Sequence, residues 1–150
     1  LGDVYKRQVQ TIGHDKLNQL RHVKFFKDLE GVHAHMKKHA AILRPKFEMV
    51  EATLEKELGG LGIGEWTTPK GGYFISFESL DGCAKKIVAM AKEAGVVMTG
   101  AGATYPYGKD PKDSNIRIAP SFPPIEELEK AAQVFVVCVK LASVEKLLAE

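Results

Sequence analysis

The stretch that decides the fold is G-E-W-T-T-P-K-G-G-Y-F-I-S-F-E, residues 64–78. Strand-forming residues lie on both sides of a proline- and glycine-rich segment at residues 69–72, which is typical of a turn. In the second half, Tyr73, Ile75 and Phe77 alternate with Phe74 and Ser76. The stretch therefore predicts two strands of one sheet, with both faces at least partly covered.

A long helix is expected upstream of these strands, because apolar residues recur there every three or four positions. They are Val32, Met36, Ala40, Leu43, Phe47, Val50, Leu54 and Leu58. Pro45 lies within this helix and is expected to kink it, since proline removes a backbone donor. Gly59-Gly60 should end the helix. Before it, a shorter helix is expected to open at His14-Asp15.

Downstream, helices and short strands alternate. Asp81 is expected to cap a helix that Gly95 stops. Residues 96–98 and residues 115–119 are predicted to be strands. A last helix should begin at Pro123-Pro124 and continue through the V-F-V-V-C-V segment. This order predicts an α/β fold in which helices cover one face of a mixed sheet.

The composition is that of an ordinary globular protein, with 45% hydrophobic and 27% charged residues. A net charge of +2 implies neither a nucleic-acid partner nor a membrane partner. No apolar run reaches the roughly twenty residues of a spanning helix, and no secretory signal is visible. We therefore expect a cytoplasmic protein. Cys83 and Cys138 lie among apolar residues, so buried thiols are favoured over a disulfide.

The first eight residues, L-G-D-V-Y-K-R-Q, differ in kind from the rest of the chain. D-V-Y-K-R-Q can be encoded by a transposon end that is used in preparing sequencing libraries. We expect residues 1–8 to be a non-native scar and exclude them from the fold prediction. The protein would then be a fragment whose natural N-terminal part is missing.

Arg117 is the candidate binding residue, and it is one of only four arginines among 21 basic residues. Side chains alternate along a strand, so Arg117 faces solvent or a cleft if Ile116 and Ile118 meet the core. The residues alone favour the solvated alternative. The functional alternative is a guanidinium fork that binds a carboxylate through two parallel hydrogen bonds.

Other residues with reactive side chains favour structural interpretations. His35 and His39 share a helical face, but no third ligand stands at a familiar spacing, so a solvated face is favoured over a metal site. The T-G-A-G-A-T loop, residues 99–104, is followed by Y-P-Y-G rather than by a helix. A structural turn is therefore favoured over a phosphate site. No serine–histidine–acid order stands out.

Three segments together resemble a known family: G-G-Y-F-I-S-F at residues 71–77, A-K-K-I-V-A-M-A-K-E-A-G-V-V-M-T-G-A-G-A-T-Y-P-Y-G at residues 84–108, and N-I-R-I-A-P-S-F-P at residues 115–123. They resemble the C-terminal part of a fold-type I aminotransferase dependent on pyridoxal phosphate (PLP), in particular the Ic subgroup of aspartate aminotransferases. The resemblance covers residues 10–149. It implies that residues 9–27 end the large domain and that residues 28–150 form the small C-terminal domain.

The resemblance also implies a function. In this family, an arginine on the last strand of the small domain binds the α-carboxylate of the amino-acid substrate, and Arg117 occupies that place. The complete enzyme is expected to move an amino group between an amino acid and a 2-oxo acid, with aspartate and glutamate as candidate donors. It is also expected to be a homodimer.

The family's other active-site residues are expected upstream of this chain. These are the Schiff-base lysine, the aspartate partner of the pyridine nitrogen and the phosphate-binding residues, so no catalytic, cofactor-binding or metal-binding residue is expected here. Lys70 lies at a hairpin turn and is expected to be solvated. For Arg21 and Lys24, surface charge is favoured over a role in reading a substrate side chain. The rival hypothesis is a stand-alone, non-catalytic α/β module that binds a small carboxylate.

Overall fold

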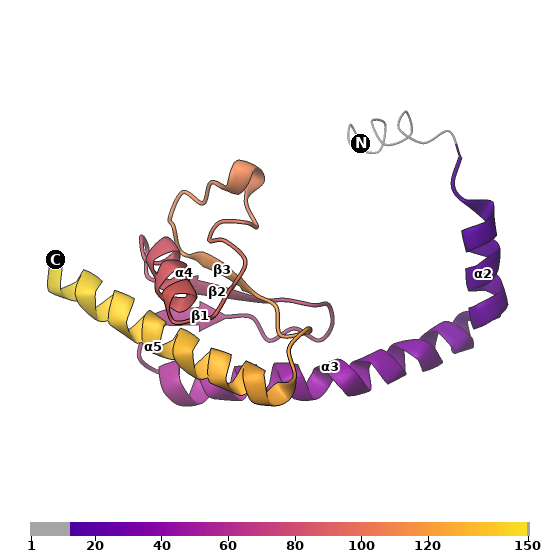
Figure 1. The fold of residues 1–150 in the computed structure, drawn as a ribbon, viewed down its shortest axis with the longest axis horizontal. Coiled ribbons are helices and arrows are strands. Elements are labelled where there is room, and N and C mark those ends of the chain that lie inside the picture. The colour runs from indigo at the N-terminus through magenta and orange to yellow at the C-terminus, as the bar shows by residue number, and fades with distance from the viewer. Residues whose placement is uncertain (1–12, 150) are drawn as a thin grey trace. The chain divides into compact units, whose positions relative to one another are not determined.

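The computed structural model describes residues 13–149, so the expectation for residues 1–8 lies outside the described residues. The chain divides into two compact units, Leu1–Ala41 and Ile42–Glu150. Figure 1 labels the helices and strands of both units. Within the described part of the chain, each helix is too short or too polar to cross a bilayer.

The first unit contains helix α2, Lys16–Phe26, and the beginning of helix α3, Leu29–Leu58. The Asp15 carboxylate caps α2, since its Oδ1 accepts a hydrogen bond from the Asn18 backbone N–H at 3.1 Å. This confirms the helix that was predicted to open at His14-Asp15. Asp28 serves α3 in the same way, because its Oδ1 accepts from the Gly31 N–H at 2.8 Å.

Helix α3 is continuous through Pro45, and the kink expected at that residue stays a prediction. In the second unit, Val50, Leu54 and Leu58 of this helix are buried, which confirms the C-terminal end of the predicted apolar stripe, whereas Met36 of the first unit is exposed. The helix ends at Leu58, immediately before Gly59-Gly60, as expected. Gly60 adopts φ 74°, a left-handed conformation that glycine reaches without strain.

The sheet has three strands in the order β1-β2-β3: β1 is Gly64–Trp66, β2 is Ile75–Ser79 and β3 is Asn115–Ile118. Both pairings are antiparallel, so the described sheet is purely antiparallel, and the prediction of a mixed sheet is wrong. The reason is that residues 96–98 form no strand. The Val96 N–H instead donates to the Ala91 carbonyl at 2.8 Å, which completes the preceding helix.

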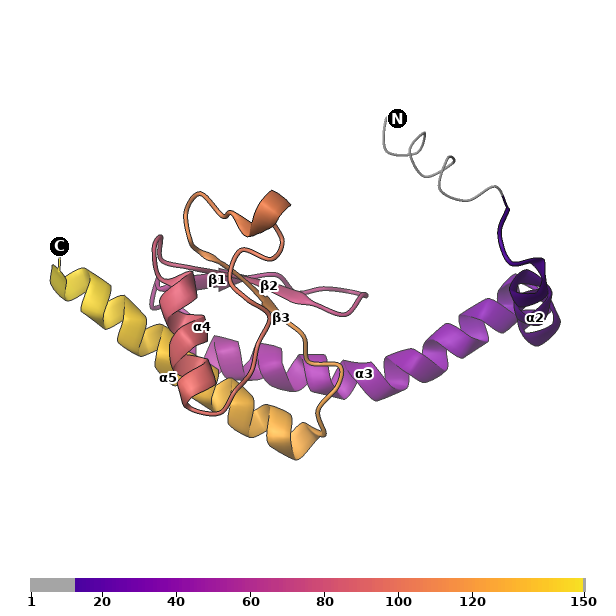
Figure 2. The ribbon, with the colours of Figure 1, turned by 45° about the horizontal axis from the view of Figure 1, so that its top comes forward.

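The core lies on one face of the sheet, where Ile75 and Phe77 of β2 are buried next to Ile116 and Ile118 of β3. Figure 2 shows α4 (Ala84–Glu93), α5 (Ile125–Ala149) and the C-terminal part of α3 on this side. The V-F-V-V-C-V segment is helical as predicted. The α/β fold with helices on one face is thus confirmed. Both cysteines are buried, and neither forms a disulfide.

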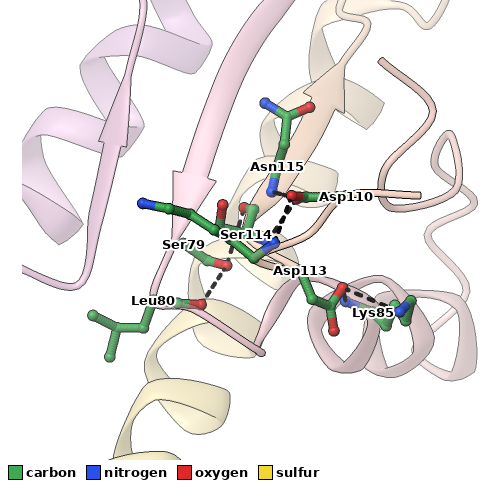
Figure 3. Close-up of polar contacts among 8 residues, drawn as sticks. Ser79, Leu80, Lys85, Asp110, Asp113, Ser114 and Asn115 are labelled. Atoms are coloured by element: carbon green, nitrogen blue, oxygen red, sulfur yellow. Dashed lines mark hydrogen bonds and ion pairs between the residues drawn. The ribbon is translucent and has the colours of Figure 1, made fainter. Parts of the chain in front are cut away.

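Helix α4 is capped from a distant part of the chain, so the expected cap by Asp81 is wrong. The Asp113 Oδ1 accepts from the Lys85 N–H at 3.2 Å, and the Asp113 carbonyl accepts from the Ala84 N–H at 2.8 Å (Figure 3). Asp81 is exposed. A cap that is 28 residues away in sequence cannot be recognised from the local pattern.

The loop before β3 is organised by Asp110. Its Oδ2 accepts from the backbone N–H groups of Ser114 and Asn115, both at 2.8 Å (Figure 3). Its Oδ1 accepts from the Lys112 N–H at 3.0 Å. Burial alone would raise the pKa of the Asp110 carboxyl, but the surrounding N–H donors outweigh it and lower the pKa below its usual value. Asp110 therefore fixes the backbone where β3 begins.

Candidate functional site around Arg117

Arg117 lies on β3 directly opposite Ser76 of β2. Its neighbours Ile116 and Ile118 are buried in the core, whereas Arg117 is half-buried. Since successive side chains of a strand point to opposite faces, Arg117 lies on the face away from the core residues. The alternation that was predicted for this strand is confirmed.

The guanidinium of Arg117 contacts an aromatic ring but has no acceptor among the described residues. Its Cζ lies 4.4 Å from the centroid of the Phe74 ring. The Nε is buried and makes no hydrogen bond within the described part of the chain. Leaving a buried donor unsatisfied costs about 1–3 kcal/mol. The arrangement therefore favours a ligand that brings an acceptor to Arg117.

The carboxylate of Glu78, which lies on the same sheet face, already accepts hydrogen bonds from neutral donors. Its Oε1 accepts from the Asn115 Nδ2 at 2.5 Å, and its Oε2 accepts from the Ser114 Oγ at 2.8 Å. Asn115 is itself held, because its Nδ2 also donates to the Ser76 Oγ at 2.9 Å and its Oδ1 accepts from the Thr104 Oγ1. No carboxylate among the described residues forms an ion pair with Arg117.

A cavity of about 200 Å³ lies on the core side of the sheet, between α3, α5, the end of β3 and residues 96–99, and Arg117 is among the residues that line it. The lining is mostly apolar and includes Leu54, Met98 and Phe135. No lysine, histidine or carboxylate lines this cavity.

The loop that follows β3 is tied to α3 by a lysine. The Lys46 ammonium donates to the carbonyls of Ser121 at 2.9 Å and Pro123 at 2.6 Å. Both acceptors lie between Arg117 and the start of α5. Lys46 is thus satisfied by backbone carbonyls, and its role is structural.

The remaining candidates lie apart from any such arrangement. Lys70 is exposed in the turn between β1 and β2, as expected. His35 and His39 approach each other, with 2.9 Å between their Nε2 atoms, but no group of three or more metal-binding side chains exists within residues 13–149. The T-G-A-G-A-T loop forms a turn that is followed by a single 3-10 turn, Pro106–Gly108, rather than by a long helix.

Arg21 and Lys24 are exposed on α2 in the first unit, and a role for either of them stays a prediction. Sequence reasoning missed Phe74 and Glu78, which lie on the same sheet face as Arg117. Phe74 and Glu78 could have been found from their spacing, because each lies two positions from Ser76 and alternate residues of a strand share a face. What the sequence lacked was the β2–β3 register, which pairs Ser76 with Arg117.

Comparison with known proteins decides the family, because the family model of aspartate amino-transferases matches residues 2–150. The chain belongs to the aspartate aminotransferase family. An aspartate aminotransferase of Corynebacterium glutamicum is 49% identical over 137 residues, which are 91% of this chain and 32% of that protein. The chain thus spans about a third of the length of that family member.

Solved structures of family members and of more distant aminotransferases share this fold. The crystal structure of an aspartate transaminase from Corynebacterium glutamicum matches with a TM-score of 0.87 and 48% identity, over 94% of this chain and 33% of that chain. An α-aminoadipate aminotransferase from Thermus thermophilus, complexed with N-(5'-phosphopyridoxyl)-L-leucine, matches with a TM-score of 0.70 and 20% identity, over 93% of this chain and 34% of that chain. The second match concerns the fold alone.

Proposed function

We propose that the full-length protein is a PLP-dependent aminotransferase that moves an amino group between an amino acid and a 2-oxo acid, with aspartate or glutamate as donor. In this proposal Arg117 binds the α-carboxylate of the substrate. The observation that carries the assignment is the buried Arg117 Nε, which has no acceptor within the described residues. Family membership supports the reaction class.

The guanidinium suits this role because its geometry matches that of a carboxylate. Two parallel N–H groups bind the two carboxylate oxygens, which fixes both the position and the orientation of the substrate. Each charge-assisted hydrogen bond contributes about 1.5–3 kcal/mol. A substrate held in this way presents its Cα–H bond in one direction, which lowers the barrier by positioning.

The residues around Arg117 fit a substrate carboxylate and do not fit the cofactor. The cavity beside Arg117 has no lysine that could form a Schiff base. We therefore assign the Schiff-base lysine and the cofactor-binding residues to parts of the full-length protein outside this chain. Membership in the aspartate aminotransferase family supports PLP as the cofactor.

The organisation of the whole protein is part of the same proposal. Residues 9–27 would end the large domain, and residues 28–150 would form the small C-terminal domain. The complete enzyme would be a cytoplasmic homodimer. The two buried cysteines, neither of which is in a disulfide, support a reducing location.

Replacing Arg117 tests the proposal in the full-length enzyme. We expect Arg117→Ala to lower kcat/KM for the amino-acid substrate by about 10²-fold or more, since roughly 3 kcal/mol of transition-state binding is lost. The absorbance of bound PLP should be unchanged, because Arg117 is assigned to the substrate. Arg44→Ala removes an exposed arginine of α3 and is the matched control, expected to leave kcat/KM unchanged.

Two results would contradict this assignment. Normal turnover by Arg117→Ala would remove Arg117 from the substrate site. An absence of amino transfer in the wild-type protein, together with carboxylate binding that depends on Arg117 in calorimetry, would instead favour the stand-alone, non-catalytic module.

A further inference from the structure

The side chain of Phe74 is the one aromatic contact of Arg117 within residues 13–149, and the proposed function gives it no role. The Arg117 Cζ lies over the Phe74 ring at 4.4 Å from its centroid, well within the range of a cation–π contact. The described residues offer the guanidinium no hydrogen-bond acceptor that would orient it. An arginine side chain whose N–H groups have no acceptor needs another constraint to hold it in one orientation, because its rotamer freedom is large.

We propose that Phe74 is a positioning residue that holds the Arg117 guanidinium in the orientation that receives the α-carboxylate. This inference rests on the proposed function. The negative face of an aromatic ring attracts the guanidinium without using any of its N–H groups. All of the in-plane donors of Arg117 therefore stay available for a carboxylate. An acidic partner in the place of Phe74 would occupy those donors.

The backbone places this ring by the same alternation that places Arg117. Phe74 immediately precedes β2 and lies two positions before Ser76, so the two side chains lie on the same face. Ser76 is the residue paired with Arg117. Phe74 and Arg117 are thus diagonal neighbours on one face of an antiparallel pair, a separation that aromatic and long side chains span. Ile75 and Phe77, on the opposite face, are fully buried and hold the register.

The alternative is that Phe74 only covers apolar surface. Phe74 is 46% exposed, so it contributes less burial than a core residue and removal of its ring should not unfold the protein. The two roles differ in their dependence on the substrate's charge. Positioning of Arg117 affects substrates that carry an α-carboxylate, whereas general packing affects all substrates alike.

The test compares an amino acid with its neutral α-carboxamide in full-length enzyme loaded with PLP. Aspartate, glutamate and alanine are first mixed with wild-type enzyme, and the fastest to change the PLP absorbance is used with its α-carboxamide. The variants are Phe74→Leu, which removes the ring, Phe74→Tyr, which keeps it, and both substitutions combined with Arg117→Ala. Tyr73→Leu removes the neighbouring exposed aromatic and is the matched control.

We expect Phe74→Leu to lower kcat/KM for the amino acid by about 3- to 30-fold, mainly through KM, and to leave kcat/KM for the carboxamide unchanged. Phe74→Tyr should restore the preference for the carboxylate. In the Arg117→Ala background, Phe74→Leu should have no further effect, since the residue that it positions is absent. Tyr73→Leu should preserve the preference.

Equal losses for the two substrates in Phe74→Leu would overturn the inference, as would an undiminished Phe74→Leu effect in the Arg117→Ala background. Failure of Phe74→Tyr to restore the preference would also overturn it. The proposed function fails separately if Arg117→Ala alone handles the amino acid as well as wild-type enzyme does, or if no amino acid reacts with the wild-type enzyme. Circular dichroism melting curves establish that each variant is folded.

Discussion

Two residues of β3, Arg117 and Asn115, lie on the same face and have complementary tasks. Arg117 forms no ion pair with the described residues, while Asn115 binds Glu78, a carboxylate on that face. A free Glu78 would be an internal competitor for the guanidinium, because an ion pair within the protein forms without loss of a ligand's translational entropy. The charge of the candidate site is therefore protected by a neutral amide.

Removing that amide should weaken substrate binding without touching Arg117. We expect Asn115→Ala to raise KM for the amino-acid substrate by about 2- to 10-fold, since Glu78 is released toward Arg117. The measurement is steady-state kinetics of the full-length enzyme at low ionic strength. Adding Glu78→Gln to the same variant removes the competing charge and should restore KM. A KM that stays high in the double variant would show that Asn115 acts by holding β3 in place.

Asp110 contributes stability that depends on pH. Its pKa is lowered in the folded protein, so the unfolded state binds the proton more tightly and stability falls as pH decreases through the folded-state pKa. The contribution is complete above the unfolded value of about 3.9. We expect Asp110→Asn to melt below wild type at pH 7, with a difference that narrows below about pH 4. Asp81→Asn is the control for an exposed aspartate, and a constant difference at all pH values would contradict this account.

At the scale of elements, helix α4 shows how a short helix depends on a distant loop. Its first N–H groups are satisfied by the carbonyl and the carboxylate of Asp113, in the loop before β3. The ammonium of Lys85, 3.9 Å from the same carboxylate, adds a weak, exposed attraction. The loop that orders the start of β3 through Asp110 thus also orders the start of α4.

Two aspartates near the start of α4 therefore differ in their expected contribution. Asp113→Ala should lower the free energy of unfolding by about 1 kcal/mol, since it removes the cap. Asp81→Ala should change it little, because the Asp81 side chain does not cap α4. The measurement is urea denaturation of both variants in parallel. A larger loss from Asp81→Ala than from Asp113→Ala would contradict the assigned cap.

Features that depend on nearby residues were predicted from the sequence, whereas features that depend on distant residues, such as the cap of α4, were not. The helical periods of α3 and α5, the hairpin around residues 69–72 and the alternation of β3 were predictable, because each depends on residues close in the chain. The strand predicted at residues 96–98 is wrong, because two valines supply strand propensity but a strand also needs a hydrogen-bonded neighbour. The cap by Asp113, the ring of Phe74 over Arg117 and the sequestered Glu78 depend on the β2–β3 register or on distant loops, which no local pattern contains.

At the scale of the whole molecule, the chain is proposed to hold one side of a substrate site. The cavity beside Arg117 is apolar apart from that cation and Thr99, and it offers no group for covalent attachment of a cofactor. The chain covers about a third of the aspartate aminotransferase that it resembles. Substrate capture and cofactor attachment are therefore expected to be divided between different parts of the full-length protein.

This division predicts the behaviour of residues 1–150 expressed alone. Mixing with PLP and reduction with borohydride should label the 17 lysines weakly and without preference, in proportion to their exposure. Peptide mass spectrometry measures the labelling at each lysine, with the full-length enzyme as the positive control. Stoichiometric labelling of one lysine, for instance Lys70, would place the cofactor site in this chain.

The alternation of β2 and β3 has a consequence for the history of the protein. Inward residues such as Ile75 and Ile116 maintain the fold, whereas the outward Arg117 is proposed to bind the ligand and Phe74 to position Arg117. Mutations can accumulate in one set without penalising the other. Selection for a new donor amino acid could thus explore the outward set while the hydrophobic scaffold remains intact, a separation that favours the evolution of new specificities.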